Sequence, residues 1–312
     1  MKLWQKGVVV VLIVLGSDQP ARAQDERIVQ MDTLNVRDVL YHLGGGEGNG
    51  LALIDEINGG VVLIDTKSSG WGEPMQEVIA QVTDLPVTTI INSHFHSEHA
   101  GSNSEFPDAT LIITHENTGA AMLRSGMYRA GSVGLPTTTF QDRFSLLEDL
   151  DRIELYHFGA AHTNGDIVVV FPEKAVAYLG DLFPDKAVPS VDVEHGGSAT
   201  AFADTLAKVV SGIDGVSRVI TGHGRFPTTY AGRGRRDRGA ARAWTGFMTW
   251  DDLAEYADFV QEFVGEVEEA FSAGRTVDET AESLTIQERY SGYDMTDARA
   301  MIEVLYGELA SR

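Results

Sequence analysis

A cluster of histidines is the feature of this sequence that most directly indicates chemistry. His94, His96, Glu98 and His99 lie within six residues, in the order His-Phe-His-Ser-Glu-His. In an extended or turning chain, alternate side chains point to the same side, so His94 and His96 can bind one metal ion. Glu98 and His99 lie further round the turn and can reach a second ion. The alternative is a histidine-rich surface turn, although such density is uncommon by chance.

Three later motifs could complete a metal site. His162 lies in Ala-His-Thr-Asn-Gly-Asp, Asp181 follows an apolar stretch, and His223 lies between two glycines. Alone, the first is an ordinary loop histidine and the second an aspartate that forms a turn at a strand end. Together they supply the ligands that the first cluster lacks. Imidazole and carboxylate are the groups that zinc accepts where no thiolate is present, and this chain has no cysteine.

The elements that must position these residues are predicted as strands that end just before the motifs. Val87–Asn92 leads into the histidine cluster, Ala175–Leu179 into Asp181, and Arg218–Thr221 into His223. Two sets of strands, each followed by helices, indicate two packed sheets with helices outside. The remaining predicted strands are Val39–Leu43, Leu51–Asp55, Val61–Asp65, Thr110–Thr114, Ile153–Phe158 and Ile167–Phe171, and the predicted helices are Pro74–Val82, Glu116–Arg124, Thr200–Val210, Trp250–Phe271 and Asp297–Leu309, with a loop at 125–140.

The composition excludes several classes of protein. The chain has 312 residues, of which 43% are hydrophobic and 22% charged, a globular balance that excludes disordered, collagen-like and coiled-coil proteins. Its formal net charge of −22 repels phosphate backbones, so we expect no nucleic-acid partner. The absence of cysteine excludes disulfides, thiol nucleophiles and iron–sulfur clusters.

The N-terminus has the pattern of an export signal. Lys2 and Lys6 precede the apolar run Val8–Leu15, and an Ala-x-Ala cleavage pattern ends at Ala23. The apolar run is too short to span a membrane. We therefore expect residues 1–23 to be a signal peptide and the mature protein to be secreted, most simply into a bacterial periplasm, with no membrane attachment. The alternative is a buried N-terminal strand.

The order of the site residues resembles a known family signature. The metallo-β-lactamase superfamily has His-x-His-x-Asp-His, then a later His, an Asp or Cys, and a final His. Val62–Thr66 and Gly159–Thr163 resemble the same family, and the resemblance covers roughly residues 35–225. It implies an α/β fold, an αββα sandwich of two mixed β-sheets flanked by helices, and says little about the substrate. The residues that match the signature are His94, His96, Glu98, His99, His162, Asp181 and His223.

The resemblance also implies two zinc ions per chain at the sheet edge. His94, His96 and His162 would hold the first ion. The second would take Glu98, His99 and His223, with Asp181 between the two. Three neutral imidazoles leave one tetrahedral position for water, and bound zinc lowers the pKa of water to about 7, which produces a nucleophile at neutral pH. We expect Glu98 and Asp181 to be the catalytic carboxylates.

Glu98 departs from the family pattern, which usually has Asp there. The longer side chain can still bind the second ion after a small loop shift, can leave that site weak and give a one-zinc enzyme, or can silence the site. We favour retained binding because every other ligand is present. A set of histidines and carboxylates also accepts iron or manganese in place of zinc.

Other residues could border a substrate pocket. Trp71 follows the strand that ends at Asp65 and could pack on a ligand or cap the core. His195 lies in a Gly-rich loop, where a solvated histidine is the alternative. The arginine-rich stretch 233–238 could attract a substrate carboxylate, although a solvated loop explains it as well.

The sequence therefore predicts a secreted, zinc-dependent hydrolase of a small-molecule substrate. A metal-bound hydroxide would cleave an amide or ester bond, and a β-lactam ranks narrowly first. A lactone or thioester hydrolase is the alternative enzyme, and a catalytically silent metal-binding protein the alternative class. We expect a metallo-β-lactamase-like domain at 24–243 and a C-terminal helical extension at 244–312 packed on the same domain; the oligomeric state is left open.

Overall fold

The computed structural model describes residues 29–34, 39–224 and 248–312. The predicted signal peptide and the arginine-rich stretch 233–238 lie outside the described residues, and both interpretations stay predictions. Within the described residues, no helix combines the length and the apolar character needed to cross a membrane.

The first sheet has seven strands in chain order and is mixed. Its first four strands form an antiparallel meander, and from the fourth strand onward the pairing is parallel. Parallel pairing needs a crossover, which the helices between these strands provide. The strands are β1 (Gln30–Thr33), β2 (Leu40–Gly44), β3 (Gly50–Asp55), β4 (Gly60–Ile64), β5 (Val87–Ile91), β6 (Leu111–His115) and β7 (Thr138–Phe140).

The second sheet has five strands and is also mixed. Three antiparallel pairings join β8 to β11, and β12 adds parallel to β11 after a helical crossover. Its strands are β8 (Arg143–Leu146), β9 (Ile153–Tyr156), β10 (Val168–Phe171), β11 (Val176–Tyr178) and β12 (Arg218–Ile220).

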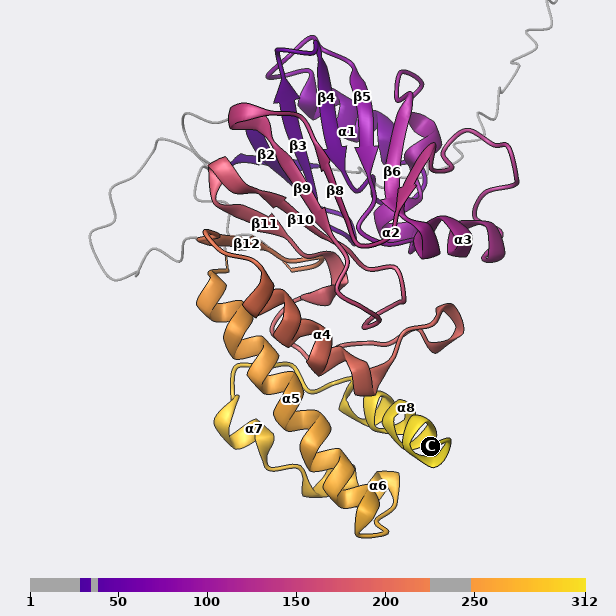
Figure 1. The fold of residues 1–312 in the computed structure, drawn as a ribbon, viewed down its shortest axis with the longest axis vertical. Coiled ribbons are helices and arrows are strands. Elements are labelled where there is room, and N and C mark those ends of the chain that lie inside the picture. The colour runs from indigo at the N-terminus through magenta and orange to yellow at the C-terminus, as the bar shows by residue number, and fades with distance from the viewer. Residues whose placement is uncertain (1–28, 35–38, 225–247) are drawn as a thin grey trace, which may run out of the picture.

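The two sheets lie face to face with helices on their outer faces, as Figure 1 shows. Alternate residues of each strand point to opposite faces. On β10, Val169 packs between the sheets, whereas Val168 and Val170 pack outward against helices. The predicted αββα sandwich is confirmed. The helices are α1 (Gly72–Ile79), α2 (Ser97–Ala100), α3 (Glu116–Arg124), α4 (Ala199–Gly212), α5 (Trp250–Ser272), α6 (Val277–Ser283), α7 (Ile286–Arg289) and α8 (Ala298–Ala310), with short 3-10 turns η1 (Asn103–Glu105), η2 (Asp149–Asp151), η3 (Pro172–Lys174), η4 (Gly180–Leu182) and η5 (Val193–His195).

Short edge elements are where the sequence prediction was wrong. The expected loop at 125–140 ends in β7, which adds parallel to β6 at the edge of the first sheet, and β8 was not predicted. Both strands are only three or four residues long, so the polar–apolar alternation of β8 is too short to mark a strand, and β7 has none. The short helices α6 and α7 were missed for the same reason.

The C-terminal helices pack on the second sheet through α4. Helix α5 lies along α4 and α8 contacts both helices. Aromatic side chains of α5, among them Phe259 and Phe263, join the hydrophobic cluster that covers the outer face of β10 and β11. Thr249 and Asp252 form a capping box at the start of α5. The division of the chain at residue 244 stays a prediction.

Candidate metal centre

The histidine and carboxylate motifs meet at one edge of the sandwich. His94 and His96 follow β5 of the first sheet, whereas Asp181 and His223 follow β11 and β12 of the second. His162 comes from the loop before β10. Because all these positions lie at the same end of the facing sheets, segments that are far apart in sequence bring their side chains together.

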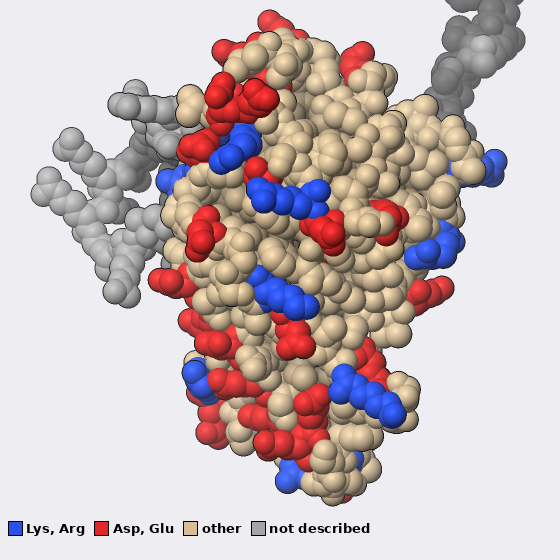
Figure 2. All heavy atoms as spheres, in the orientation of Figure 1, with Lys and Arg blue, Asp and Glu red and all other residues tan. Residues whose placement is uncertain are grey.

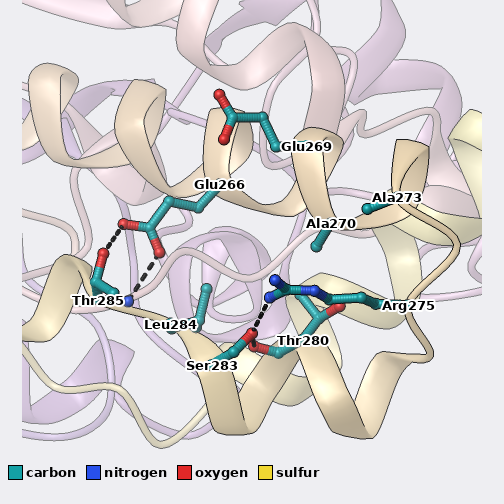
Figure 3. Close-up of a pocket in the computed structure, with 9 residues that line it drawn as sticks. All are labelled: Glu266, Glu269, Ala270, Ala273, Arg275, Thr280, Ser283, Leu284 and Thr285. Carbon is teal, nitrogen blue, oxygen red and sulfur yellow. Dashed lines mark hydrogen bonds between the residues drawn. The ribbon is translucent and has the colours of Figure 1, made fainter.

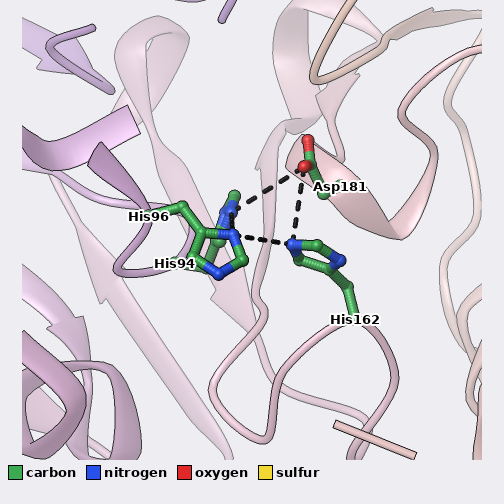
Figure 4. A group of neighbouring side chains, drawn as sticks. All are labelled: His94, His96, His162 and Asp181. Carbon is green, nitrogen blue, oxygen red and sulfur yellow. Dashed lines mark hydrogen bonds and ion pairs between the residues drawn. The ribbon is translucent and has the colours of Figure 1, made fainter. Parts of the chain in front are cut away.

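The first group contains three imidazoles and one carboxylate. His96 Nδ1 lies 3.1 Å from His94 Nε2 and 2.9 Å from His162 Nε2. Asp181 Oδ2 lies 3.9 Å from His94 Nε2 and 3.5 Å from His162 Nε2. These four atoms face one another, as Figure 4 shows. Ligand atoms around a tetrahedral zinc ion lie about 3.3–3.4 Å apart when the zinc–nitrogen bonds are about 2.0–2.1 Å, so the group fits such an ion.

The second group shares Asp181 with the first. Asp181 Oδ1 lies 3.4 Å from His99 Nε2, and Asp181 Oδ2 lies 3.1 Å from His223 Nε2. Glu98 completes this group, and its four ligand atoms lie within 4.8 Å of one another. The glutamate therefore reaches the position that the sequence assigned to it. Asp181 is placed to bridge the two groups.

Two buried atoms of the second group have no hydrogen-bond partner. They are His99 Nε2 and Asp181 Oδ1, which face each other across 3.4 Å. An unsatisfied buried polar atom costs about 1–3 kcal/mol, so proteins rarely leave one without a reason. A cation between these atoms satisfies both of them.

All five histidines are held by their outer ring nitrogens. His99 Nδ1 lies 2.8 Å from Asp65 Oδ2, and His96 Nε2 lies 2.9 Å from Asp192 Oδ2. The outer nitrogens of the other three face Ser93 Oγ and two backbone carbonyls. An acceptor at the outer nitrogen fixes the ring proton there and leaves a lone pair on the inner nitrogen. The remaining pairs are His94–Ser93 Oγ at 3.1 Å, His162–Ser190 O at 2.9 Å and His223–Glu47 O at 2.7 Å.

Asp65 is the buried anchor of this arrangement. Its Oδ2 accepts hydrogen bonds from Tyr178 Oη and Ser93 Oγ, and its Oδ1 accepts one from Ser93 N. Since the Ser93 hydroxyl donates to Asp65, its oxygen is free to accept the Nδ1 proton of His94. Asp65 thus orients His99 directly and His94 through Ser93. The sequence contained this residue in the stretch that resembles the family, but its role was not predicted.

The electrostatics of the cluster favour a positive charge at His99. Burial, followed by the neighbouring His99, lowers the pKa of His94 well below its ordinary value, which keeps its ring neutral. Burial alone would lower the pKa of His99, but the carboxylates of Asp181 and Asp65 outweigh it and raise the pKa to about 10. His99 Nε2 is therefore a position that attracts a proton or a metal cation.

The charge count supports two divalent cations. Glu98 and Asp181 lie among the ligands, and Asp65 and Asp192 lie directly behind His99 and His96. Four carboxylates offset the charge of two doubly positive ions, and buried charge needs such compensation. The residues present therefore fit a pair of divalent metal ions.

The structure places the two pocket candidates in different surroundings. His195 Nδ1 lies 2.8 Å from Asp192 Oδ2, and its ring packs on Phe95 at 4.3 Å between centroids. The ring of Trp71 covers Gly46 in the turn between β2 and β3 and packs on the core beneath α1. Asp192, which joins His96 to His195, carried no signal in the sequence.

A separate cavity lies between α5 and α6. It has a volume of about 380 Å³, and Figure 3 shows its polar lining. Glu266 accepts hydrogen bonds from the backbone and hydroxyl of Thr285, and Arg275 donates to Ser283 Oγ. These lining groups satisfy one another, and none of them belongs to the metal centre.

Known proteins share this sequence pattern in part. The chain is 31% identical over 156 residues to 2,4-dinitroanisole O-demethylase subunit alpha of Nocardioides sp. (strain JS1661), a match that covers 48% of this chain and 46% of that protein. It is 24% identical over 184 residues to metallo-beta-lactamase type 2 of Bacteroides fragilis, covering 58% of this chain and 70% of that protein. The chain thus matches less than half of the demethylase subunit.

Solved structures share the fold. DIM-1 metallo-beta-lactamase superposes with a TM-score of 0.56 at 14% identity, covering 75% of this chain and 98% of that structure. A metallo-beta-lactamase from Pontibacter korlensis has a TM-score of 0.56 at 17% identity, with coverage of 75% and 99%. A family model described as the metallo-beta-lactamase superfamily matches residues 45–223, a segment that contains every residue of the two ligand groups. The chain belongs to the metallo-β-lactamase superfamily.

Proposed function

We propose that this protein is a zinc-dependent hydrolase with two metal ions per chain. One observation carries the proposal: two groups of ligand atoms share Asp181, and each imidazole in them is held by its outer nitrogen. A histidine-rich turn without a metal would have no need for such complete orientation. Zinc ranks before iron and manganese because tetrahedral imidazole sites suit it well.

Asp181 and Glu98 have different roles in the proposed hydrolysis. The ions, when bound, polarise a carbonyl group and lower the pKa of water, so that a nucleophile is available near neutral pH. Asp181 is buried and its Oδ2 lies near histidines of both groups, so its part is to fix the spacing of the site. Glu98 is only half-buried, so it is the carboxylate of the centre that solvent and substrate reach. The Glu98 carboxylate accepts a hydrogen bond from Ser97 Oγ at 3.1 Å.

The serine that adjoins the first ligand group is not available as a nucleophile. Ser93 is buried, and its hydroxyl donates to Asp65. With metal-activated water as the nucleophile, the proposed reaction needs no covalent intermediate with the protein. Attack of water on an acyl carbon would cleave an amide or ester bond directly.

The substrate class is proposed from the relatives and from the ligand set. We propose a β-lactam, narrowly, as the first substrate candidate, which the likeness to a Bacteroides fragilis metallo-beta-lactamase and the predicted export support. A lactone or thioester hydrolase is the alternative, because Asp181 stands where many β-lactamases have Cys or Ser. The demethylase name of another relative adds 2,4-dinitroanisole to the substrates worth testing. We also propose that the mature protein is periplasmic or secreted, which N-terminal sequencing of the exported protein tests.

The experiment combines metal analysis with a substrate panel. The purified mature chain is loaded with zinc or stripped with EDTA, and then offered a chromogenic cephalosporin, a lactone, a thioester and 2,4-dinitroanisole. We expect two zinc ions per chain and turnover that EDTA abolishes. His162→Gln should remove the activity, whereas His115→Gln, a buried histidine outside the cluster, should keep it. Bound zinc without turnover on any substrate would favour the silent metal-binding protein.

A further inference from the structure

Two histidines of the first ligand group depend on one loop. This loop, residues 183–198, runs from η4 to the start of α4. Its Ser190 carbonyl accepts from His162 Nδ1 at 2.9 Å, and its Asp192 carboxylate accepts from His96 Nε2 at 2.9 Å. Asp192 N also donates to His162 O at 2.8 Å. The loop therefore sets both the rings and part of the backbone of the first group.

The C-terminal helices hold this loop at its first half. The chain at Asp294 runs beside residues 186–188 as an isolated bridge. Val188 N donates to Asp294 O, and Asp294 N donates to Lys186 O, each at 2.9 Å. Lys186 Nζ also pairs with Asp252 Oδ1 of α5 at 2.8 Å.

Glu308 of α8 holds the loop at its far end. Its carboxylate accepts from Ala199 N at 2.7 Å, Thr200 N at 3.0 Å, Thr200 Oγ1 at 2.6 Å and Ser198 Oγ at 3.1 Å. These donors form the first turn of α4, which begins directly after the loop. A carboxylate at a helix N-terminus is stabilised by the unpaired amide groups and the helix dipole. Figure 1 shows α8 beside α4 at this end of the molecule.

We propose that the C-terminal helices are a positioning element of the metal centre. Glu308 and the chain at Asp294 fix the two ends of the 183–198 loop, and the loop in turn orients His96 and His162. The inference rests on the proposed binding of zinc by these histidines. Glu308 is a positioning residue, since it touches neither a ligand nor the reacting atoms.

The test compares two variants of the same helix in the full mature chain. Glu308→Gln keeps the shape and removes the charge at α4, whereas Glu303→Gln changes an exposed glutamate that pairs only with Arg299 at the surface. Zinc affinity is measured by competition with a chelating indicator, and the geometry of the first group by the visible spectrum of the Co²⁺-loaded protein. Asp192→Asn serves as the reference that acts directly on His96.

We expect Asp192→Asn to weaken zinc binding by about 10–100-fold, the usual effect of losing such an outer hydrogen bond. Glu308→Gln should weaken it by about three- to tenfold, because it acts one step further away, and should change the cobalt spectrum. Glu303→Gln should leave both unchanged. If Glu308→Gln does not fold, Glu308→Asp, which keeps the charge but shortens its reach, should shift both readouts in the same direction.

Two results are distinguishable from one another. A Glu308 variant that lowers the melting temperature but binds zinc like the parent, with the parent's cobalt spectrum, overturns the positioning role and leaves the proposed function intact. A parent protein that binds no zinc overturns the proposed function itself, and the inference with it.

Discussion

The chemistry of this centre depends on Glu98. Its side chain is one methylene longer than that of the usual aspartate, and its carboxylate lies in the second ligand group. It is also the ligand carboxylate with the greater exposure, because Asp181 is buried at the edge of the sandwich. Loss of the Glu98 charge should therefore weaken binding of the second metal ion more than binding of the first.

Replacing Glu98 with Gln should reduce the zinc content from two ions per chain to about one, because the amide supplies no negative charge and is a poor zinc ligand. Metal analysis after gel filtration measures this. Glu194→Gln, an exposed glutamate on the 183–198 loop, is the matched control and should keep both ions. Two ions in the Glu98→Gln protein would show that the glutamate does not bind metal. Glu98→Asp with unchanged zinc content and rate would show that the extra methylene is neutral.

A second pair of histidines, outside the metal centre, should make stability depend on pH. His115 and His157 stack with their ring centroids 3.9 Å apart. Burial, and then repulsion from His157, lower the pKa of His115 to about 4. The unfolded chain therefore binds a proton near pH 6.5 that the folded protein refuses, so stability falls as the pH drops below that value.

Between pH 7 and pH 5 this residue should cost about 1–2 kcal/mol of the free energy of unfolding. His115→Asn removes the titrating ring but keeps a side chain that can cap α3, where His115 Nδ1 accepts from Asn117 N. Urea unfolding of both proteins at pH 7 and pH 5, with EDTA present so that the metal centre contributes equally, measures the difference. Equal losses in the two proteins would contradict the prediction.

At the scale of elements, the turn between β2 and β3 carries part of the metal centre. Its Glu47 carbonyl holds His223, and Lys67 holds the turn by donating to the carbonyls of Leu43 and Gly48. Lys67 is fully buried, and burial lowers its pKa to about 7. Its backbone lies in the left-handed region with φ of 62°, a strained conformation for a non-glycine residue. A strained conformation of this kind is retained where the contacts that it allows, here the two hydrogen bonds of Lys67, are needed.

Lys67→Met should therefore lower the free energy of unfolding by about 2 kcal/mol or more, because it removes the donor of two buried hydrogen bonds. The substitution should also weaken binding of the second metal ion, because it loosens the turn that holds His223. Thermal unfolding and zinc analysis measure the two effects. Lys208→Met, an exposed lysine of α4, should change neither. A stable Lys67→Met protein with two zinc ions would show that the turn holds its shape alone.

At the scale of the whole molecule, negative charge is unevenly spread. Helix α5 contains eight Asp and Glu residues and no Lys or Arg in its 23 residues. Figure 2 shows acidic side chains gathered on the part of the surface formed by the C-terminal helices. Like charges this close repel one another and destabilise the folded state, and the effect is screened by salt.

Raising the sodium chloride concentration from about 0.01 M to about 0.5 M should therefore raise the melting temperature, because the screening length falls from about 30 Å to a few ångströms. Scanning calorimetry of the metal-free protein measures it. The double variant Asp258→Asn and Glu269→Gln, at two exposed positions of α5, should show a smaller rise than the parent. An equal rise in both would place the repulsion elsewhere in the molecule.

The metal ligands could be predicted because their information is local. His94, His96, Glu98 and His99 occupy one short segment, and Asp181 and His223 each follow an apolar strand that periodicity reveals. The long elements α3 and α5 were predicted with bounds within one residue, since apolar spacing and capping residues mark them. Hence the sequence alone determined the family, the sandwich of two sheets and the candidate ligand set.

The tertiary structure decided what holds those ligands. Asp65, Asp192, Ser190 and Glu308 act on residues from 28 to 110 positions away in the chain. No local pattern marks a carbonyl or a carboxylate as the partner of one particular imidazole, because that pairing depends on where two sheets and a loop meet. The strands β7 and β8 were missed because each has only three or four residues, and their pairing with β6 and β9 is visible only in the fold. Ligand identity is a property of residue type and spacing, whereas ligand orientation is a property of the assembled fold.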